Sequence, residues 1–330
     1  MNFSGVEKIA AAILYEGYIL YPYRPSSMKN RQRWNFGTLY PRVYAETQSP
    51  QEPFRLVAEC IVEAGAGDAS LDLKIQFLQL LRQQGNLSAS IPCVTRSLTD
   101  PSLAWEEATE RTSEQQNLRL NDLVEPLTLA LQFDDSDLPD GTNLRQLENL
   151  QAQLTIGAEP LPSGAHKIHL ELQNTSPLRS GKEAKREEVL PRSFVSAHVL
   201  MGIHGGQFVS LLDPPGTYQA SVASCQNTGV FPVLAGEEPD RSILFCSPII
   251  LYDYPKIAPE SEGDFFDGTE MDEMLTLRVL TLTDAEKQEM RNGDPRARRI
   301  LERTESMTAE SMMKAHGVIR GMRDIREDLP

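Results

Sequence analysis

The sequence has few cysteines and no long hydrophobic run. No C-x-x-C pair occurs among its four cysteines, so neither a zinc knuckle nor a thioredoxin-type motif is written locally. The longest apolar stretch, residues 9–15, is too short to span a bilayer and follows no basic leader. We therefore expect a cytoplasmic protein without membrane insertion, in which four thiols remain free: Cys60, Cys93, Cys225 and Cys246.

Local catalytic motifs are also missing. The chain contains no G-x-S-x-G elbow, no Walker lysine motif and no H-E-x-x-H helix. A catalytic Cys–His pair assembled from distant parts of the chain stays open. Positive charge is scarce, because 32 Lys and Arg stand against 47 Asp and Glu, a formal net charge of -15. This balance disfavours nucleic acid and anionic membranes as partners and suits basic partners or cations.

The remaining composition is that of a globular protein with 330 residues, 40% of them hydrophobic. Apolar and polar residues alternate strictly in residues 71–77, 127–133 and 168–172, which predicts strands with one solvated face. Residues 193–203 and 242–252 are more continuously apolar and predict strands buried on both faces. We expect a mainly β fold, a sandwich or barrel-like arrangement of antiparallel sheets.

The β-rich body is expected to span residues 1–282, as one domain or as two subdomains divided near 174–192. Residues 134–142 are acidic and rich in turn formers, and residues 174–192 are basic with few apolar side chains. Both segments are expected to be exposed loops.

A helical appendage is expected in residues 283–330. Thr283 and Glu286 have the spacing of a capping box that opens a helix. Pro295 is suited to the first position of a second helix, and Thr308 to the cap of a last one.

The segment of residues 15–44 is unusual because it interleaves eight of the chain's aromatic residues with basic ones. Aromatic and guanidinium groups together are common in interface hot spots, and they also grip anions. A plain β-hairpin with a solvated basic loop is the alternative. The residues of the expected interaction surface are Tyr18, Tyr21, Tyr23, Arg24, Lys29, Arg31, Arg33, Trp34 and Arg42.

A second unusual segment, residues 253–273, has eight acidic residues against one lysine. Carboxylates in such a loop suit a hard divalent cation, although the EF-hand spacing is absent, and His198 is a further candidate if folding brings it near. The alternative is a solvated acidic loop that docks on the basic residues 296–303. The candidate metal ligands are Asp253, Glu260, Asp264, Asp267 and Glu270.

Both unusual segments carry a family resemblance. Residues 14–42 (LYEGYILYPYRPSSMKNRQRWNFGTLYPR) and residues 247–287 (SPIILYDYPKIAPESEGDFFDGTEMDEMLTLRVLTLTDAEK) resemble a bacterial family that we associate with gene neighbourhoods of nickel–iron hydrogenases. The resemblance extends over most of the chain, including residues 194–216 and 296–305. It implies a protein partner, either a hydrogenase subunit or a maturation factor, and it transfers no catalytic residue.

Two functions are therefore weighed. The first is a non-catalytic accessory or assembly protein that acts through protein–protein contacts, as the resemblance implies for hydrogenase maturation or function. The second is an enzyme or metal-handling protein that holds a divalent cation in residues 253–273. Binding of RNA or another polyanion by the basic segment is opposed by the net charge of -15.

Overall fold

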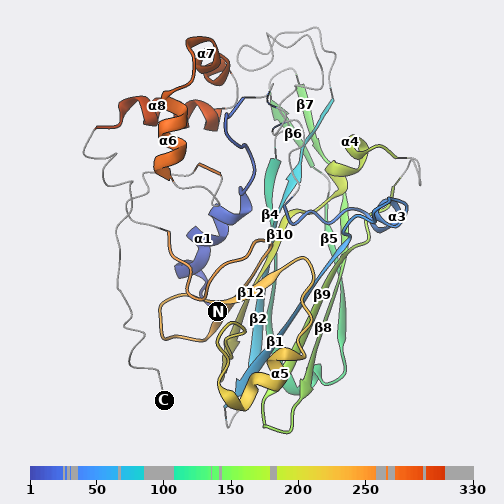
Figure 1. Ribbon diagram of the computed structural model, residues 1–330. Helices are drawn as coiled ribbons and strands as arrows, with labels where there is room; N and C mark the ends of the chain where they lie inside the picture. The colour runs from blue at the N-terminus through green and yellow to red at the C-terminus, as the bar shows by residue number, and fades with distance from the viewer. Residues whose placement is uncertain are drawn as a thin grey trace. The chain divides into compact units, whose positions relative to one another are not determined.

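The described chain falls into two compact units. The computed structural model describes residues 1–24, 27, 30, 36–65, 68–84, 108–134, 136–140, 143–178, 184–257, 265–266, 272–292 and 295–308 (Figure 1). Unit 1 takes the described residues within Met1–Tyr18, Trp34–Ser90 and Glu106–Lys256, and unit 2 takes those within Ile19–Arg33 and Ile257–Pro330. The boundary suggested by the sequence at 282/283 falls inside unit 2.

Unit 1 is built on two five-stranded antiparallel sheets, so the predicted mainly β fold is confirmed. The first sheet has the order β11 (Gly206–Phe208), β1 (Arg55–Ala64), β9 (His166–Asn174), β8 (Leu150–Pro160) and β5 (Leu127–Phe133). The second has the order β12 (Phe231–Ala235), β13 (Ile243–Ser247), β10 (Val195–His204), β2 (Ser70–Leu80) and β4 (Ala108–Arg119). A short helix, α3 (Arg42–Ala45), precedes β1. Short helical turns lie between the strands: η2 (Leu120–Leu123), α4 (Arg186–Val189), η4 (Leu190–Arg192), η5 (Gly216–Tyr218) and α5 (Gln219–Ala223).

One apolar core joins the two sheets. Side chains alternate along a strand, so every second residue of each strand reaches this core. The inner residues of β1 and β9 share a cluster with those of β2 and β10, as the membership of Leu56, Leu170, Ile75 and Val199 shows. Phe194, which follows the segment 174–192, belongs to the same cluster. Residues on both sides of that segment therefore contribute to one core.

The outer face of the second sheet is covered by α1 (Ser4–Leu14). Val6, Ala10 and Ile13 of this helix pack with Leu200 of β10 and Phe245 of β13. β10 is therefore buried on both faces, as predicted. β2 was expected to have one solvated face. It is instead buried along most of its length, because α1 also contacts β2 on the face that carries its polar side chains.

The two segments expected to be exposed loops contain regular structure. Within residues 134–142, β6 (Ser136–Asp140) pairs with β7 (Asn143–Leu147), which also pairs with β3 (Arg82–Gln84) in a small third sheet. Hydrogen bonds between strands join backbone groups and do not depend on the side chains, so the acidic composition gave no sign of this small sheet. Within residues 174–192, α4 and η4 bury Val189 and Leu190, and the loop prediction is wrong there.

Unit 2 contains α6 (Asp272–Leu280), α7 (Asp284–Asn292) and α8 (Pro295–Ser306). The predicted capping box is confirmed, since the Glu286 carboxylate accepts hydrogen bonds from the backbone N–H and the hydroxyl of Thr283, both at 2.8 Å. Pro295 is the first residue of α8, as predicted. The helix predicted after Thr308 lies outside the described residues. None of the described helices is long and apolar enough to cross a bilayer.

An aromatic cluster links the two sheets at one end of the core. The ring of Phe77 on β2 lies 4.9 Å from that of Phe133 on β5 and 4.3 Å from that of Phe194, centroid to centroid. Phe77 is fully buried, so its removal leaves a cavity between the sheets.

We predict that Phe77→Ala lowers the free energy of unfolding by about 3–5 kcal/mol, measured by urea denaturation. The control is Phe231→Ala, at a half-exposed phenylalanine of β12, which should cost less than about 1 kcal/mol. Equal losses from the two variants would contradict the assignment of Phe77 to the shared core.

Candidate interaction surface

The described residues of the expected aromatic and basic surface make contacts within their own units. Tyr18 and Arg42 belong to unit 1, whereas Tyr21, Tyr23 and Arg24 belong to unit 2. The other members lie outside the described residues: Lys29, Arg31, Arg33 and Trp34. The prediction of a single surface formed by all nine residues therefore stays a prediction.

Two of the tyrosines are buried. In unit 1 the ring of Tyr18 packs edge-on against Tyr15, with centroids 5.8 Å apart. In unit 2 the ring of Tyr23 is fully buried, and its hydroxyl donates a hydrogen bond to the carbonyl oxygen of Phe265 at 3.1 Å. In this structure Tyr18 and Tyr23 serve the packing of the protein rather than its surface.

The basic members have acidic partners of the same unit. The Arg24 guanidinium lies 3.0 Å from the Glu286 carboxylate and 3.6 Å from that of Glu289. Arg42 pairs with Glu46 one helical turn away, with a distance of 2.7 Å between Nε and Oε1. The first two ion pairs join Arg24 to α7, and the third lies on the exposed side of the short α3.

Asp253, the first of the predicted metal ligands, acts as a clamp in this structure. One of its carboxylate oxygens accepts a hydrogen bond from the backbone N–H of Leu234 at 2.8 Å. The other accepts one from the Ser210 hydroxyl at 2.5 Å, and Ser210 Oγ in turn accepts the backbone N–H of Asp213 at 2.9 Å. Asp253 therefore ties the segment after β13 to β12 and to the loop after β11.

This clamp also protects the edge of the second sheet. β12 is the outermost strand of this sheet. The backbone N–H of its Leu234 donates a hydrogen bond to the Asp253 carboxylate, and the Leu234 carbonyl oxygen accepts one from the Tyr254 N–H at 2.7 Å. Along an edge strand, every second residue directs its backbone N–H and C=O away from the neighbouring strand. In β12 these residues are Leu234 and Pro232, and Pro232 has no N–H that could pair with a further strand. Both devices stop further strands from adding at this edge.

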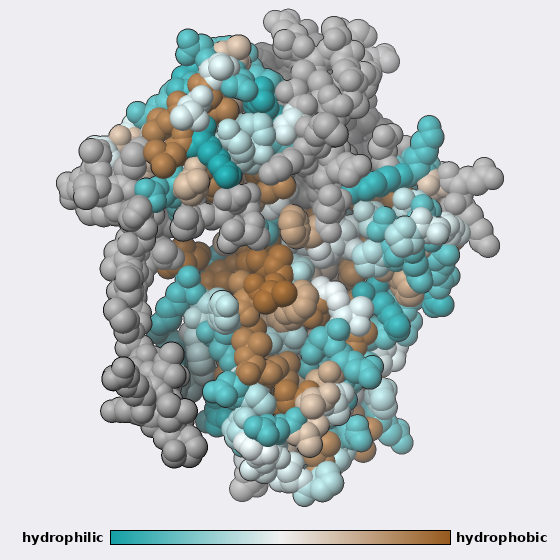
Figure 2. Space-filling model, viewed as in Figure 1, coloured by the Kyte–Doolittle hydropathy of each residue, from teal (hydrophilic) through white to brown (hydrophobic). Residues whose placement is uncertain are grey.

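The segment between β13 and the clamp has an apolar side that faces solvent. Ile249 and Leu251 pack onto the cluster formed by α1 and the outer face of β12 and β13. The residues between and after them point outward: Ile250 is 76% exposed and Tyr252 is 86% exposed. We call Ile250 and Tyr252 the apolar strip. Figure 2, which has the same view as Figure 1, shows hydrophobic residues gathered in the middle of the molecule's visible face, over α1 and the neighbouring segments.

Charged residues of both signs lie near Tyr254, two residues after the end of the apolar strip. The turn between β12 and β13 contains Glu237, Glu238 and Asp240, and Lys256 lies 4.0 Å from the Glu237 carboxylate. Burial raises the pKa of Tyr254, and the carboxylates of Asp253 and Glu238 raise it further, whereas the nearby guanidinium of Arg241 opposes the shift. The strip therefore presents large apolar side chains on a segment that ends near charges of both signs, an arrangement that suits a partner with an apolar anchor.

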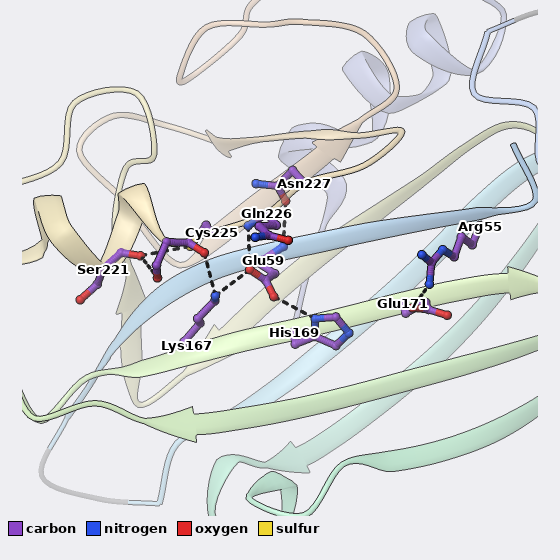
Figure 3. A network of polar contacts seen from close by, with 10 residues as sticks. Arg55, Glu59, Lys167, His169, Glu171, Ser221, Cys225, Gln226 and Asn227 are labelled. Carbon is purple, nitrogen blue, oxygen red and sulfur yellow. Dashed lines mark hydrogen bonds and ion pairs between the residues drawn. The ribbon is translucent and has the colours of Figure 1, made fainter.

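A separate polar network covers the outer face of the first sheet (Figure 3). At its centre the Glu59 carboxylate of β1 lies 2.7 Å from Lys167 Nζ and accepts a hydrogen bond from His169 Nδ1 at 3.1 Å, both on β9. It also accepts the backbone N–H of Gln226 at 2.7 Å, and the side-chain oxygen of Asn227 accepts the Glu59 N–H at 2.7 Å. The network thus fastens the loop that follows α5 to β1.

The chemistry of this network is that of an anchor. Partial burial raises the pKa of Glu59, but the hydrogen bonds from Lys167, Gln226 and His169 outweigh burial and hold the pKa below its usual value. The carboxylate is therefore ionised at neutral pH, and its oxygens are already engaged. Lys167 is held in addition by the carbonyl oxygen of Ser224 at 3.0 Å.

Cys225 lies beside this network, and burial raises the pKa of its thiol to about 11 although Lys167 opposes the shift. The thiol is therefore protonated at neutral pH, which makes it a poor nucleophile. Burial also raises the pKa values of Cys60 and Cys246, two core thiols. Of the four cysteines, Cys93 lies outside the described residues; the described three are free thiols, as expected.

The other predicted metal ligands cannot be placed beside Asp253, since Glu260, Asp264, Asp267 and Glu270 lie outside the described residues. Within the part of the chain that the structure describes, no three acidic, histidine or cysteine side chains are arranged to hold a metal ion. His198 is fully buried on β10, and burial lowers its pKa to about 4. Its Nδ1–H donates to the carbonyl oxygen of Ser196 at 2.9 Å, which fits a neutral imidazole.

Sequence reasoning missed both the Glu59 network and the apolar strip. Glu59 is more than a hundred residues from Lys167, and no local pattern links them. The strip fell inside residues 242–252, which were predicted to form a buried strand. β13 ends at Ser247, and Pro248 after it was the available signal, because proline cannot donate a hydrogen bond to a sheet.

We predict that Glu59→Gln lowers the free energy of unfolding by about 1–2 kcal/mol at pH 7, because Lys167 and His169 lose their charged partner. The matched control is Glu171→Gln on β9, whose exposed pair with Arg55 is expected to contribute less than about 1 kcal/mol. The measurement is urea unfolding of each variant.

The difference between wild type and Glu59→Gln should depend on pH with a defined sign. Folding lowers the pKa of Glu59, so its contribution is complete above the ordinary pKa of 4.5 and disappears as the pH falls through the lowered value. A difference that grows toward acidic pH would contradict the anchoring role.

Comparison with known proteins adds no relative to these observations. No protein-family model matches the chain, and no curated protein matches it.

Proposed function

We propose that this protein is a non-catalytic accessory or assembly protein, and that it binds its protein partner through the apolar strip. The observation that carries the proposal is the exposure of two neighbouring large side chains, 76% for Ile250 and 86% for Tyr252, on a segment fixed by Asp253. Tyrosine and large apolar side chains that lose their contact with water on binding supply much of the energy of protein interfaces.

The fixed geometry of the segment favours tight binding. Ordering a mobile loop on association costs free energy, and a segment already held at both sides avoids most of that cost. Ile249 and Leu251 pack the segment against the cluster under α1, and the hydrogen bonds of Asp253 attach its end to β12 and Ser210. The strip is thus presented in the conformation in which a partner would meet it.

The family resemblance suggests which partner to test. In this proposal the partner is a subunit or maturation factor of a nickel–iron hydrogenase, and the protein works in the cytoplasm. That compartment keeps thiols such as Cys60 and Cys246 reduced. The formal net charge of -15 favours a partner whose contact surface carries lysine or arginine.

The test is affinity capture of the tagged full-length protein from a bacterium that produces a nickel–iron hydrogenase, with mass spectrometry of the captured proteins. We predict that the wild type recovers hydrogenase subunits or maturation factors. The double variant Ile250→Asp/Tyr252→Ser should reduce that recovery about tenfold or more, because it removes the apolar anchors while leaving the core intact.

A matched double variant separates the strip from apolar surface in general. Val124→Asp/Leu127→Ser changes two exposed apolar residues, one just after η2 and one at the first position of β5, and should leave recovery unchanged. Equal recovery with the strip variant and the wild type would contradict the role of the strip. A wild type that captures no hydrogenase protein would contradict the proposed partner.

A further inference from the structure

The second sheet has another edge, formed by β4, which is built differently from the edge at β12. β4 is the outermost strand beyond β2, and among the described residues no strand pairs with its outer side. It is 12 residues long and contains no proline. Four inter-strand spacings of about 4.8 Å separate β4 from β12, so the two edges lie about 19 Å apart.

The hydrogen bonds of the sheet determine which residues of β4 direct their backbone groups outward. Ile203 of β10 donates its N–H to the carbonyl oxygen of the opposite residue, Ser242, at 2.9 Å. Every second residue of β10 from Ile203 therefore bonds toward β13, and the residues between them bond toward β2. The registers of β10 with β2 and of β2 with β4 continue this alternation across the sheet. Glu110, Thr112 and Glu114 of β4 therefore direct their N–H and C=O groups away from β2.

This outer side of β4, which we call the β4 edge, can accept a further strand. Its three outward residues offer three N–H and three C=O groups to a chain that lies beside them, which is how an extended peptide adds to a sheet. β12 has no such run, because Pro232 and the Asp253 clamp occupy its outward positions.

The side chains of the same residues are exposed on one face of β4 and carry two negative charges. The Glu110 carboxylate accepts a hydrogen bond from a neutral group, the Tyr15 hydroxyl, at 2.9 Å. The Glu114 carboxylate lies 3.9 Å from Lys74, whose closer partner is Glu7 at 2.9 Å. Because a carboxylate has several acceptor positions, each of the two can also bind a cation from an added strand.

The arginine between these two glutamates belongs to the opposite face of the strand. The Arg111 guanidinium lies over the ring of Phe133, 5.7 Å from its centroid, and donates a hydrogen bond to the carbonyl oxygen of Asp134 at 3.1 Å. Arg111 is therefore directed toward the first sheet, away from Glu110 and Glu114.

A small pocket of about 130 Å³ lies beside Glu114. Its lining includes charged side chains of both signs, Glu7 and Lys74, and the polar Gln116. A pocket of this size is below the range of small-molecule sites, so it suits a single side chain. Such pockets beside a sheet edge select side chains at alternate positions of an added strand.

We propose that the β4 edge binds an extended segment of a protein partner, which adds to the second sheet as a further strand and carries lysine or arginine opposite Glu110 and Glu114. Four residues of a strand extend over about 13 Å, so the two basic residues stand four positions apart in the partner. A second copy of this chain fits less well, since two β4 edges would bring four carboxylates into one ladder. The net charge of -15 also favours a basic segment.

The test uses a nine-residue peptide of threonine, serine and valine, blocked at both ends, with lysines at its third and seventh positions. Its binding to the full-length protein is measured by fluorescence anisotropy at low ionic strength, beside a peptide with glutamates at the same two positions. We predict saturable binding of the lysine peptide to one site. The glutamate peptide should bind at least about tenfold more weakly.

Variants of β4 separate backbone pairing from charge. Thr112→Pro removes an outward N–H, leaves the hydrogen bonds to β2 in place and should weaken binding of the lysine peptide about tenfold or more. The matched control, Thr112→Val, keeps the N–H and should change the affinity less than about twofold. Glu110→Gln/Glu114→Gln keeps the backbone unchanged and should also weaken binding about tenfold or more, because it removes both charges.

Three results would overturn the proposal. No saturable binding of the lysine peptide would mean that the edge takes no added strand, as when another part of the chain covers it. Equal binding by Thr112→Pro and Thr112→Val would mean that the attraction is diffuse. A dimer of the free protein that Thr112→Pro dissociates would assign the edge to a second copy. The strip variant Ile250→Asp/Tyr252→Ser should bind the lysine peptide like the wild type, which separates this proposal from the proposed function.

Discussion

The burial of one face of each five-stranded sheet against the other is the constraint on which unit 1 depends. Inner residues such as Leu170 and Val199 leave water together, and apolar burial of this kind is the main favourable term in folding. The arrangement leaves two outer faces, and each has its own cover. α1 packs on the second sheet, and the loop after α5 is fastened to the first by Glu59.

The candidate surface follows from the same constraint. The second sheet must end somewhere, and β12 ends it with Pro232 and with the Asp253 clamp at Leu234. The segment that delivers Asp253 to this edge crosses the outer face and buries alternate residues there. Its remaining side chains, Ile250 and Tyr252, are then presented to solvent. Edge protection and partner binding thus depend on one short stretch of chain.

Local patterns predicted much of the fold, because the signal for a strand or a helix start lies within a few consecutive residues. The alternation in residues 71–77, 127–133 and 168–172 gave β2, β5 and β9, and the spacing of Thr283 and Glu286 gave the start of α7. The β6–β7 hairpin escaped prediction, since backbone pairing dominated over its acidic composition.

The candidate sites were beyond the same reasoning. Asp253 meets Ser210 and Leu234, and Glu59 meets Lys167, only through folding. In the fold, the Asp253 carboxylate accepts hydrogen bonds from the Ser210 hydroxyl and the Leu234 N–H. A sequence shows that a carboxylate is present, but the strand order decides what it faces.

The most direct test of the account is hydrogen exchange of the full-length protein, free and in complex with a captured partner. Amides that a partner covers exchange more slowly, whatever the partner's identity. We predict that protection on binding is centred on residues 248–254, including Ile250 and Tyr252. Protection confined to the outer face of the first sheet, with no change in that segment, would contradict it.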